Sequence, residues 1–222
     1  MVPTGLPQLD SILGGGYPNR STILVVGPPG IGKEALGYWF AASGLKEGDF
    51  CLYITRLAVS EVKEDIGAFG GDGKGEPMWM ADQGGQIKCD ISDLAGLSIR
   101  IKETLRDRGA GVRIRVVTDI LSSLLMLNPP DTVYRFLAQL FAEVKRYDAV
   151  IFAILEEGMH LTQVQAAMEQ LFDGVMELRL HEDGLKIRPL LRIRKMRGLP
   201  PRPGYFLFSF TGSKMEISAY VK

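Results

Sequence analysis

Eight residues near the start of the chain, GPPGIGKE, have the composition and spacing of a loop that binds phosphate. Glycines allow tight turns in which several backbone N–H groups point at an anion, and a following helix adds the positive end of its dipole. The lysine of such a loop reaches the β- and γ-phosphates of a nucleotide. We therefore expect nucleotide contacts along the whole stretch: Gly27, Pro28, Pro29, Gly30, Ile31, Gly32, Lys33 and Glu34.

Glu34 departs from the usual motif, which continues after the lysine with Ser or Thr, whose hydroxyl binds Mg²⁺. A carboxylate is also a ligand for Mg²⁺, so Glu34 is a candidate to hold the metal directly. It is longer than serine, however, and would crowd the metal, or repel the phosphates if the metal is absent. A third interpretation is that Glu34 turns outward, as an acid in the first turn of a helix that suits the helix dipole.

A second acidic residue, Asp119, ends the apolar stretch RIRVVTD. Nucleotide-hydrolysing proteins with this loop hold Mg²⁺ through an Asp at the end of another buried strand, so Asp119 is a candidate metal ligand. The alternative is that Asp119 only caps the end of the strand. Ser122 and Ser123 follow it and offer polar groups near the same place.

The elements that must position these residues alternate between short apolar runs and helical patterns. Such alternation implies a mostly parallel sheet between helices, and the late run of strands with glycine-containing turns predicts antiparallel additions at one edge. Residues 70–85, rich in Gly and Asp, are expected to form a loop with at most one short strand. We expect strands at 21–27, 50–55, 113–120, 149–155, 175–180, 187–196 and 204–210, and helices at 33–48, 60–70, 93–109, 131–148 and 161–174.

The composition predicts one ordinary globular domain over residues 1–222. Hydrophobic residues make up 46% and charged residues 23%, which excludes a disordered chain, and no apolar run approaches the ~20 residues of a membrane span. The 26 Lys and Arg balance the 26 Asp and Glu, so net charge neither favours nor excludes nucleic acid. Cys51 and Cys89 lack metal-like spacing, and there is no signal-peptide pattern, so we expect reduced thiols in a cytoplasmic protein.

Taken in order, these residues resemble the single-domain KaiC-like ATPases of the RecA superfamily, a type common in archaea, with a degenerate phosphate loop. The resemblance implies a RecA-like P-loop core, in which a mostly parallel sheet is flanked by helices and ends in antiparallel C-terminal strands. It also implies ATP and Mg²⁺ at the boundary between subunits of a homo-oligomer, often a hexameric ring. The matching pieces cover almost the whole chain: TGLPQLDSILGGGYP (4–18), GPPGIGK (27–33), VVTDILSSLL (116–125), EEGMH (156–160), LFDGVMELR (171–179) and IRKMRG (193–198).

In that family the KMRG segment points basic side chains at the γ-phosphate of the neighbouring subunit, which implies this role for Lys195 and Arg197. The charge of this region agrees in part with a phosphate-binding role, because positions 177–202 hold eight Lys or Arg against three acids. A basic stripe of this kind suits phosphate, nucleic acid or an acidic partner. The alternative is a solvated, charged edge strand.

The chain departs from the family where active members carry two adjacent glutamates after the second strand. One of these orients or deprotonates the attacking water, and the aligned residues here are Leu57 and Ala58. The next carboxylate, Glu61, belongs to the start of a helix. Because losing a general base or a water-positioning group costs ~10²–10⁴-fold in rate, this departure and Glu34 together predict weak or absent hydrolysis.

Two other features have two interpretations each. Glu156 and Glu157 follow a core strand, where RecA-like folds often sense the γ-phosphate, but they also suit the first turn of a helix. Trp79 lies in PMWM, which is either an exposed patch for a protein partner or a segment folded back onto the core.

The sequence thus predicts an ATP-binding regulatory or scaffold protein that signals through ring assembly or an unknown protein partner. Two alternatives stay open. One is an active ATPase that uses Glu34 in a remodelled site, and the other is a single-stranded DNA binder, like the recombinase paralogues, that uses the basic C-terminal strands.

Overall fold

The computed structural model describes residues 1–71, 75, 77–81, 84–88, 90–108, 111–184, 186–201, 203–211 and 214–219. The helices of this part are α1 (Pro7–Leu13), α2 (Lys33–Glu47), α3 (Val59–Ala68), α4 (Leu94–Arg108), α5 (Leu121–Leu127), α6 (Pro130–Val144) and α7 (Thr162–Leu171). The strands are β1 (Thr22–Gly27), β2 (Phe50–Thr55), β3 (Met78–Ala81), β4 (Ile87–Lys88), β5 (Ile114–Thr118), β6 (Ala149–Glu156), β7 (Gly174–Asp183), β8 (Lys186–Met196), β9 (Phe206–Thr211) and β10 (Lys214–Ala219).

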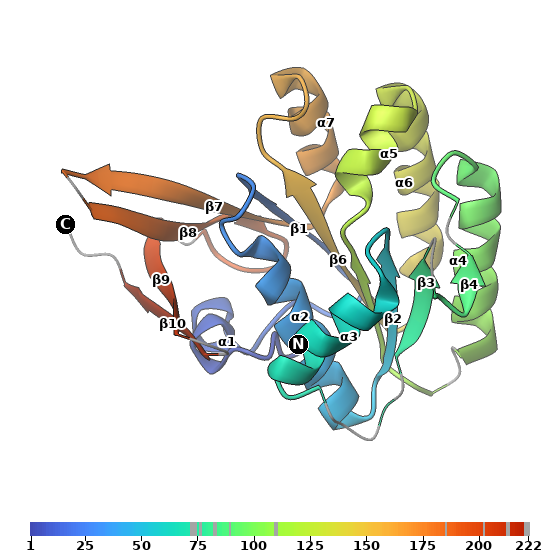
Figure 1. Cartoon of the computed structure of the whole chain (residues 1–222), viewed down its shortest axis with the longest axis horizontal. Coiled ribbons are helices and arrows are strands. Elements are labelled where there is room, and N and C mark those ends of the chain that lie inside the picture. Colours follow the sequence, from blue (N-terminus) through green and yellow to red (C-terminus); the bar gives the residue numbers. More distant parts are fainter. Residues whose placement is uncertain are drawn as a thin grey trace.

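All ten strands form one sheet in the order β10-β9-β8-β7-β1-β6-β5-β2-β3-β4. The seven strands from β7 to β4 run parallel, and antiparallel pairing of β7 with β8, β8 with β9 and β9 with β10 extends the sheet at one edge (Figure 1). The long β7–β8 hairpin projects away from the helices, to the left in Figure 1. The predicted mostly parallel sheet with antiparallel C-terminal strands, the RecA-like P-loop arrangement, is confirmed.

Helices cover both faces of the parallel part of the sheet. Because successive strand residues point to opposite faces, Val25 packs with one hydrophobic cluster, while Leu24 and Val26 pack with the other. The first cluster includes residues of α1, α2 and α3, and the second includes residues of α4, α5, α6 and α7. This arrangement leaves the carboxyl ends of the parallel strands free to carry functional side chains.

Helix α2 lies unusually close to β5 because two of its residues are glycines. A Cβ added at Gly37 would lie 3.0 Å from Cγ1 of Val117, and one at Gly44 would lie 2.5 Å from Cδ of Arg115. The Arg115 side chain is fully buried in this space, where its Nε donates to Asp49 Oδ2 at 2.7 Å and its Nη1 donates to the Pro3 carbonyl at 2.8 Å. The glycines therefore let one buried arginine tie the N-terminal segment to the sheet.

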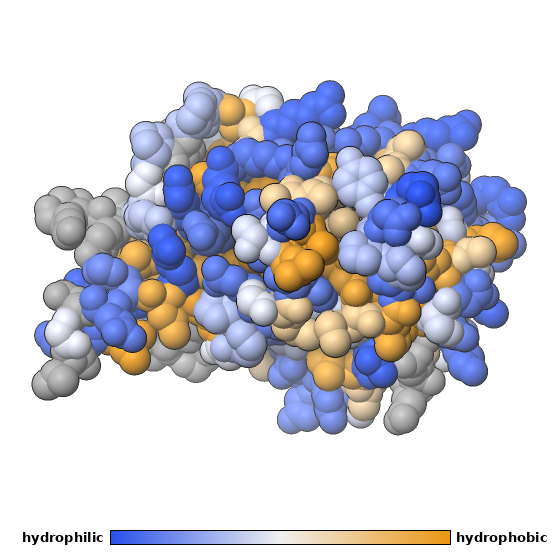
Figure 2. Space-filling model, turned by 90° about the horizontal axis from the view of Figure 1, so that it is seen from above, coloured by the Kyte–Doolittle hydropathy of each residue, from blue (hydrophilic) through white to orange (hydrophobic). Residues whose placement is uncertain are grey.

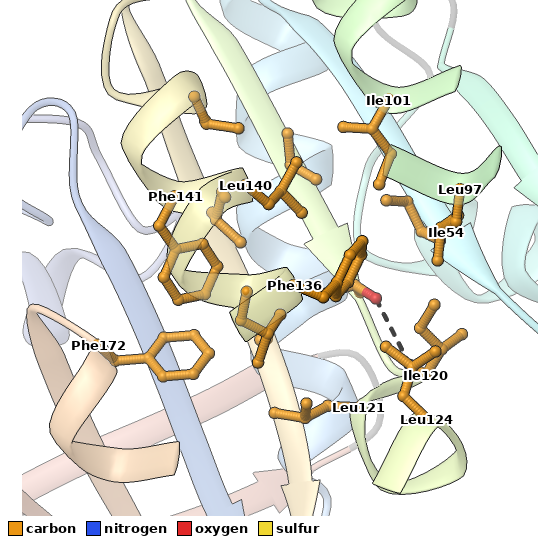
Figure 3. A pocket seen from close by; sticks show the side chains of 16 residues that line it. Ile54, Leu97, Ile101, Ile120, Leu121, Leu124, Phe136, Leu140, Phe141 and Phe172 are labelled. Carbon is orange, nitrogen blue, oxygen red and sulfur yellow. Dashed lines mark hydrogen bonds between the residues drawn. The ribbon is translucent and has the colours of Figure 1, made fainter. Parts of the chain in front are cut away.

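On the opposite face, a cavity of about 40 Å³ lies between the sheet and helices α4, α5 and α6 (Figure 3). Its walls are almost wholly apolar, and Leu97, Ile101, Phe136 and Leu140 point into it in Figure 3. The dashed line in that view joins the backbone N of Ile120 to Oγ1 of Thr118 at 3.5 Å. An apolar cavity of this kind stays dry, so it is a packing defect of the core.

The strands and long helices lie close to their expected positions, but four short elements were not expected: α1, α5, β4 and β10. Segment 70–85 contains one strand, β3, as predicted; residues 72–74, 76, 82 and 83 lie outside the described residues. Cys89 and Arg202 also lie outside them. In the described ranges, none of the helices is long and apolar enough to cross a bilayer.

Candidate nucleotide site

The loop between β1 and α2 has the backbone that a phosphate-binding turn requires. Gly30 and Gly32 have φ values of 75° and 87°, in the left-handed region that glycine adopts without a steric penalty. Gly32 is the residue that precedes the first turn of α2, and no side chain caps this end of the helix in the fully described stretch 27–34. The first N–H groups of α2 are therefore available to an anion.

Lys33 lies at the centre of this site with its side chain fully buried. Its Nζ atom is 3.0 Å from Oε1 of Glu34 and 2.9 Å from Oε2 of Glu156, and it donates to the carbonyl of Pro28 at 3.3 Å. Glu34 therefore does not simply turn outward, although its side chain is 34% exposed. The loop lysine is thus paired with two carboxylates of its own chain.

Glu156 reaches Lys33 because β6 lies directly beside β1. The two strands pair with Gly27 opposite Glu156, and the backbone N–H of Glu157 donates to the Gly27 carbonyl at 2.9 Å. The backbone N–H of Glu156 donates to Oγ of Ser122 at 2.9 Å, which fixes the strand end against α5. The helix interpretation of Glu156 is wrong, since this residue ends β6 and α7 begins at Thr162.

Asp119 follows β5 and is held by groups of the neighbouring strand β2. The hydroxyl of Thr55 donates to Oδ2 of Asp119 at 2.7 Å, and the backbone N–H of Arg56 also donates to this carboxylate. Burial, with a smaller contribution from the nearby charge of Glu34, raises the pKa of Asp119 to about 6 against these hydrogen bonds. The carboxylate is thus preorganised at the carboxyl edge of the sheet.

The donor set fits Mg²⁺ carried by a nucleotide better than a metal held by protein alone. Mg²⁺ keeps several waters and takes one or two carboxylates together with phosphate oxygens, and Asp119 supplies one such carboxylate. Among the described residues, no cluster of three or more His, Cys, Asp or Glu is arranged to hold a metal. A bound Mg²⁺ would neutralise phosphate charge there. Since the carboxylate of Glu34 is paired with Lys33, Asp119 is the better-placed of the two predicted ligands.

Positions 57 and 58, which the family resemblance aligns with two glutamates, carry only apolar side chains. Leu57 is 44% exposed, and its backbone N–H donates to Oγ1 of Thr55 at 3.0 Å. Ala58 is the residue before α3, and Glu61 is exposed in the first turn of that helix. The structure therefore places no carboxylate at positions 57 and 58.

Lys195 and Arg197 lie at the opposite end of the sheet from the loop. They flank Met196, which pairs with Gly174 beside Ile23, near the start of β1, whereas the loop follows the end of β1 about 16 Å away at the usual strand rise. Lys195 Nζ donates to the Gln170 carbonyl at 3.3 Å, and Arg197 Nη1 donates to Asp173 at 3.1 Å. These residues do not share a site with Lys33 within one chain.

The remaining expectations concern residues of the core. Trp79 is buried, with 1% of its surface exposed, so PMWM is folded back onto the core and is not a surface patch. Cys51 is buried and free, and burial raises the pKa of its thiol to about 12, as an inert core thiol requires. Thr55 was missed by sequence reasoning, although its position at the end of a strand, like that of Asp119, is a usable signal.

Side chains that follow the strand ends give the carboxyl edge an apolar component. Leu57, Met126, Met159 and Leu161 are exposed and follow β2, β5 or β6 in the chain. Figure 2 views the molecule from above, and hydrophobic side chains gather near the centre of that face among hydrophilic ones. The surface around the strand ends therefore carries both hydrophobic and hydrophilic side chains.

Comparisons with known proteins agree over almost the whole chain. A family model described as "ATPase: KaiC" matches residues 2–220. A UPF0273 protein of Aeropyrum pernix is 30% identical, in an alignment that covers 89% of this chain and 85% of that protein. A UPF0273 protein of Pyrobaculum aerophilum is 31% identical over 219 residues, with 88% and 74% covered. The circadian clock protein KaiC2 of Synechocystis is 27% identical over 208 residues, which cover 89% of this chain and 35% of that protein.

Proposed function

The chain belongs to the KaiC family of ATPases, and from this premise we propose that it is an ATP-binding regulatory or scaffold protein with weak or absent hydrolysis. Its output would be the assembly of a homo-oligomer or the recruitment of a protein partner. One observation carries the proposal: the chain keeps a well-formed phosphate loop with a buried lysine, but the two residues after β2 at positions 57 and 58 carry no carboxylate.

Binding without efficient turnover follows from which groups are kept and which are missing. The turn glycines, Lys33 and the helix start supply the contacts that hold phosphates, and Asp119 offers a ligand for the accompanying Mg²⁺. The missing group is the one that would position or deprotonate water. Its loss leaves the charge-stabilising part of the site intact and slows the chemical step by ~10²–10⁴-fold.

The two other functions receive less support from the contacts. For an active ATPase, Glu34 would have to leave Lys33 to take part in hydrolysis. For a DNA binder, the basic stripe would have to be free, yet Arg194 pairs with Glu169 at 2.8 Å and Arg197 pairs with Asp173 at 3.1 Å. The measurements described below distinguish both of these functions from the proposed one.

The proposal is tested by titrating ATP and Mg²⁺ into the full chain in a calorimeter and by measuring phosphate release from the same samples. We expect the wild type to show saturable binding that is lost in Lys33→Ala. We also expect the wild type to release phosphate at a rate close to that of Lys33→Ala. Lys46→Ala is the matched control, because Lys46 lies in the last turn of the same helix and is exposed.

Robust phosphate release that disappears in Lys33→Ala would show an active ATPase instead. Absence of binding in both the wild type and Lys46→Ala would reject a nucleotide function. A gel shift with single-stranded DNA at low salt, where phosphate contacts bind most strongly, would reveal the third function.

A further inference from the structure

The contacts around Lys33 place two negative charges on one buried positive charge. The Oε atoms of Glu34 and Glu156 lie 3.0 and 2.9 Å from Nζ. An isolated charge in a protein interior is very unfavourable unless it is paired. The two carboxylates therefore stabilise the nucleotide-free loop, in which Lys33 has no phosphate.

The two carboxylates differ in how firmly the rest of the fold holds them. Glu34 is the next residue after Lys33 in the first turn of α2, so the two residues stay close together wherever this turn moves. Glu156 comes from β6, and its backbone is fixed by Ser122, but its Oε2 atom is buried and accepts no hydrogen bond in the described part of the chain. The ion pair with Lys33 is thus the main interaction that offsets the desolvation of this oxygen.

The position of Glu156 matches that of a ligand group. Lys33 in a loop of this type contacts the β- and γ-phosphates, and Glu156 approaches it from the strand next to the loop, opposite Gly27. A phosphate oxygen on Nζ and the carboxylate oxygen of Glu156 would compete for the same ammonium group. Two anionic groups this close repel each other strongly when water is excluded.

We propose that Glu156, with Glu34, occupies Lys33 in place of the terminal phosphate, so that Glu156 sets how strongly the site prefers a nucleoside triphosphate to a diphosphate. The proposal rests on the proposed nucleotide-binding function. A triphosphate must displace the Glu156 carboxylate from Lys33, whereas a diphosphate reaches less far and disturbs it less. Glu156 therefore weakens binding of the triphosphate more than binding of the diphosphate.

The test compares Glu156→Gln with Glu157→Gln in calorimetric titrations of ATP and ADP with Mg²⁺. Both variants remove one negative charge from adjacent positions, but Glu157 is exposed and its side chain has no ion pair with Lys33. We expect Glu156→Gln to tighten ATP binding about tenfold and ADP binding by less than about threefold, since a contact with a buried charged group changes an equilibrium by roughly a factor of ten. Glu157→Gln should change either Kd by less than about twofold.

A second measurement needs no nucleotide. Thermal unfolding of the nucleotide-free protein should occur at a lower temperature in Glu156→Gln than in Glu157→Gln, and lower still in the double variant Glu34→Gln/Glu156→Gln, because Lys33 loses its counter-charges. Circular dichroism at low temperature checks that each variant is folded.

The outcomes separate the two claims. If ATP and ADP bind but Glu156→Gln matches Glu157→Gln in both measurements, the displacement proposal is wrong and the proposed function stands. If none of the proteins binds either nucleotide, the proposed function is wrong and the displacement proposal falls with it. An equal gain for ATP and ADP would also overturn the assignment of Glu156 to the terminal phosphate.

Discussion

Asp173 connects three segments of the chain at the amino end of the sheet. It accepts hydrogen bonds from the backbone N–H of Thr22 at 3.0 Å, from Lys145 at 2.9 Å and from Arg197 at 3.1 Å. Burial opposes its ionisation, but the hydrogen bonds from Lys145, Thr22 and Arg197 prevail and lower the pKa of Asp173. One carboxylate thus links β1, the residue after α6 and the residue after β8.

We predict a pH-dependent loss of stability in Asp173→Asn. A carboxyl with a lowered folded-state pKa contributes stability above its unfolded pKa of ~3.9, and this contribution is lost as the pH falls through the folded-state pKa. Unfolding by urea should show a loss of about 1.5–3 kcal/mol at pH 7, the range for hydrogen bonds to charged groups. The difference from wild type should shrink below about pH 4.

The matched control is Asp131→Asn, which removes an ion pair with Arg135 whose side chains are 67% and 66% exposed. Exposed pairs contribute roughly 0–1 kcal/mol, so its stability should stay near wild type at every pH. A pH-independent loss in Asp173→Asn would contradict the electrostatic explanation.

At the scale of single residues, the sequence predicts functional residues that belong to a contiguous motif, but it does not predict contacts made across the sheet. The loop from Gly27 to Lys33 is readable because glycine spacing alone fixes its backbone. The contact of Glu156 with Lys33 and that of Thr55 with Asp119 depend on which strands are neighbours. Strand order is set by packing of the whole chain, so the sequence left the role of Glu156 open.

At the scale of elements, β5 has one loosely packed face and one tightly packed face. Val116 lines the 40 Å³ cavity under α4 to α6, while Cγ1 of its neighbour Val117 lies 3.0 Å from where a Cβ on Gly37 would be. Alternate residues of a strand face opposite sides, so adjacent valines experience opposite packing.

We predict that Val116→Ile stabilises the protein and that Val117→Ile destabilises it. Filling the cavity recovers up to about 1 kcal/mol at ~24 cal/mol per Å³, and isoleucine keeps the β-branched shape that strands favour. The same added methylene at Val117 overpacks against α2 and costs about 1–3 kcal/mol. Urea unfolding of both variants is the measurement, and destabilisation by Val116→Ile would show that the cavity cannot accept a methylene.

Element prediction succeeded where the apolar pattern is long and failed where it is short. The buried run of β6 and the amphipathic pattern of α6 are unambiguous. Helices α1 and α5 have seven residues each, barely two turns, which is too few for a helical period to stand out. Helices this short are stabilised mainly by packing of their apolar residues against the rest of the fold.

At the scale of the whole molecule, the two predicted groups of phosphate-binding residues lie at opposite ends of the parallel sheet. Lys33 follows the carboxyl end of β1, and Arg197, which is 75% exposed, lies near its amino end. One chain therefore cannot bring Lys195 or Arg197 to its own nucleotide without refolding. If these residues contact ATP, they do so on a neighbouring copy of the chain.

The role that the family resemblance implies for these residues predicts that ATP promotes assembly and that the C-terminal basic residues are needed for it. Sedimentation velocity with ATP and Mg²⁺ should show larger species than the nucleotide-free protein. Lys195→Ala/Arg197→Ala should weaken the nucleotide-dependent association about 10–100-fold, since charge-assisted contacts contribute ~1.5–3 kcal/mol. Lys186→Ala, an exposed change at the other end of β8, is the control and should assemble as wild type does. Equal assembly of the double variant and the control would place both residues outside the subunit boundary, and their contacts with Gln170 and Asp173 would then be their whole role.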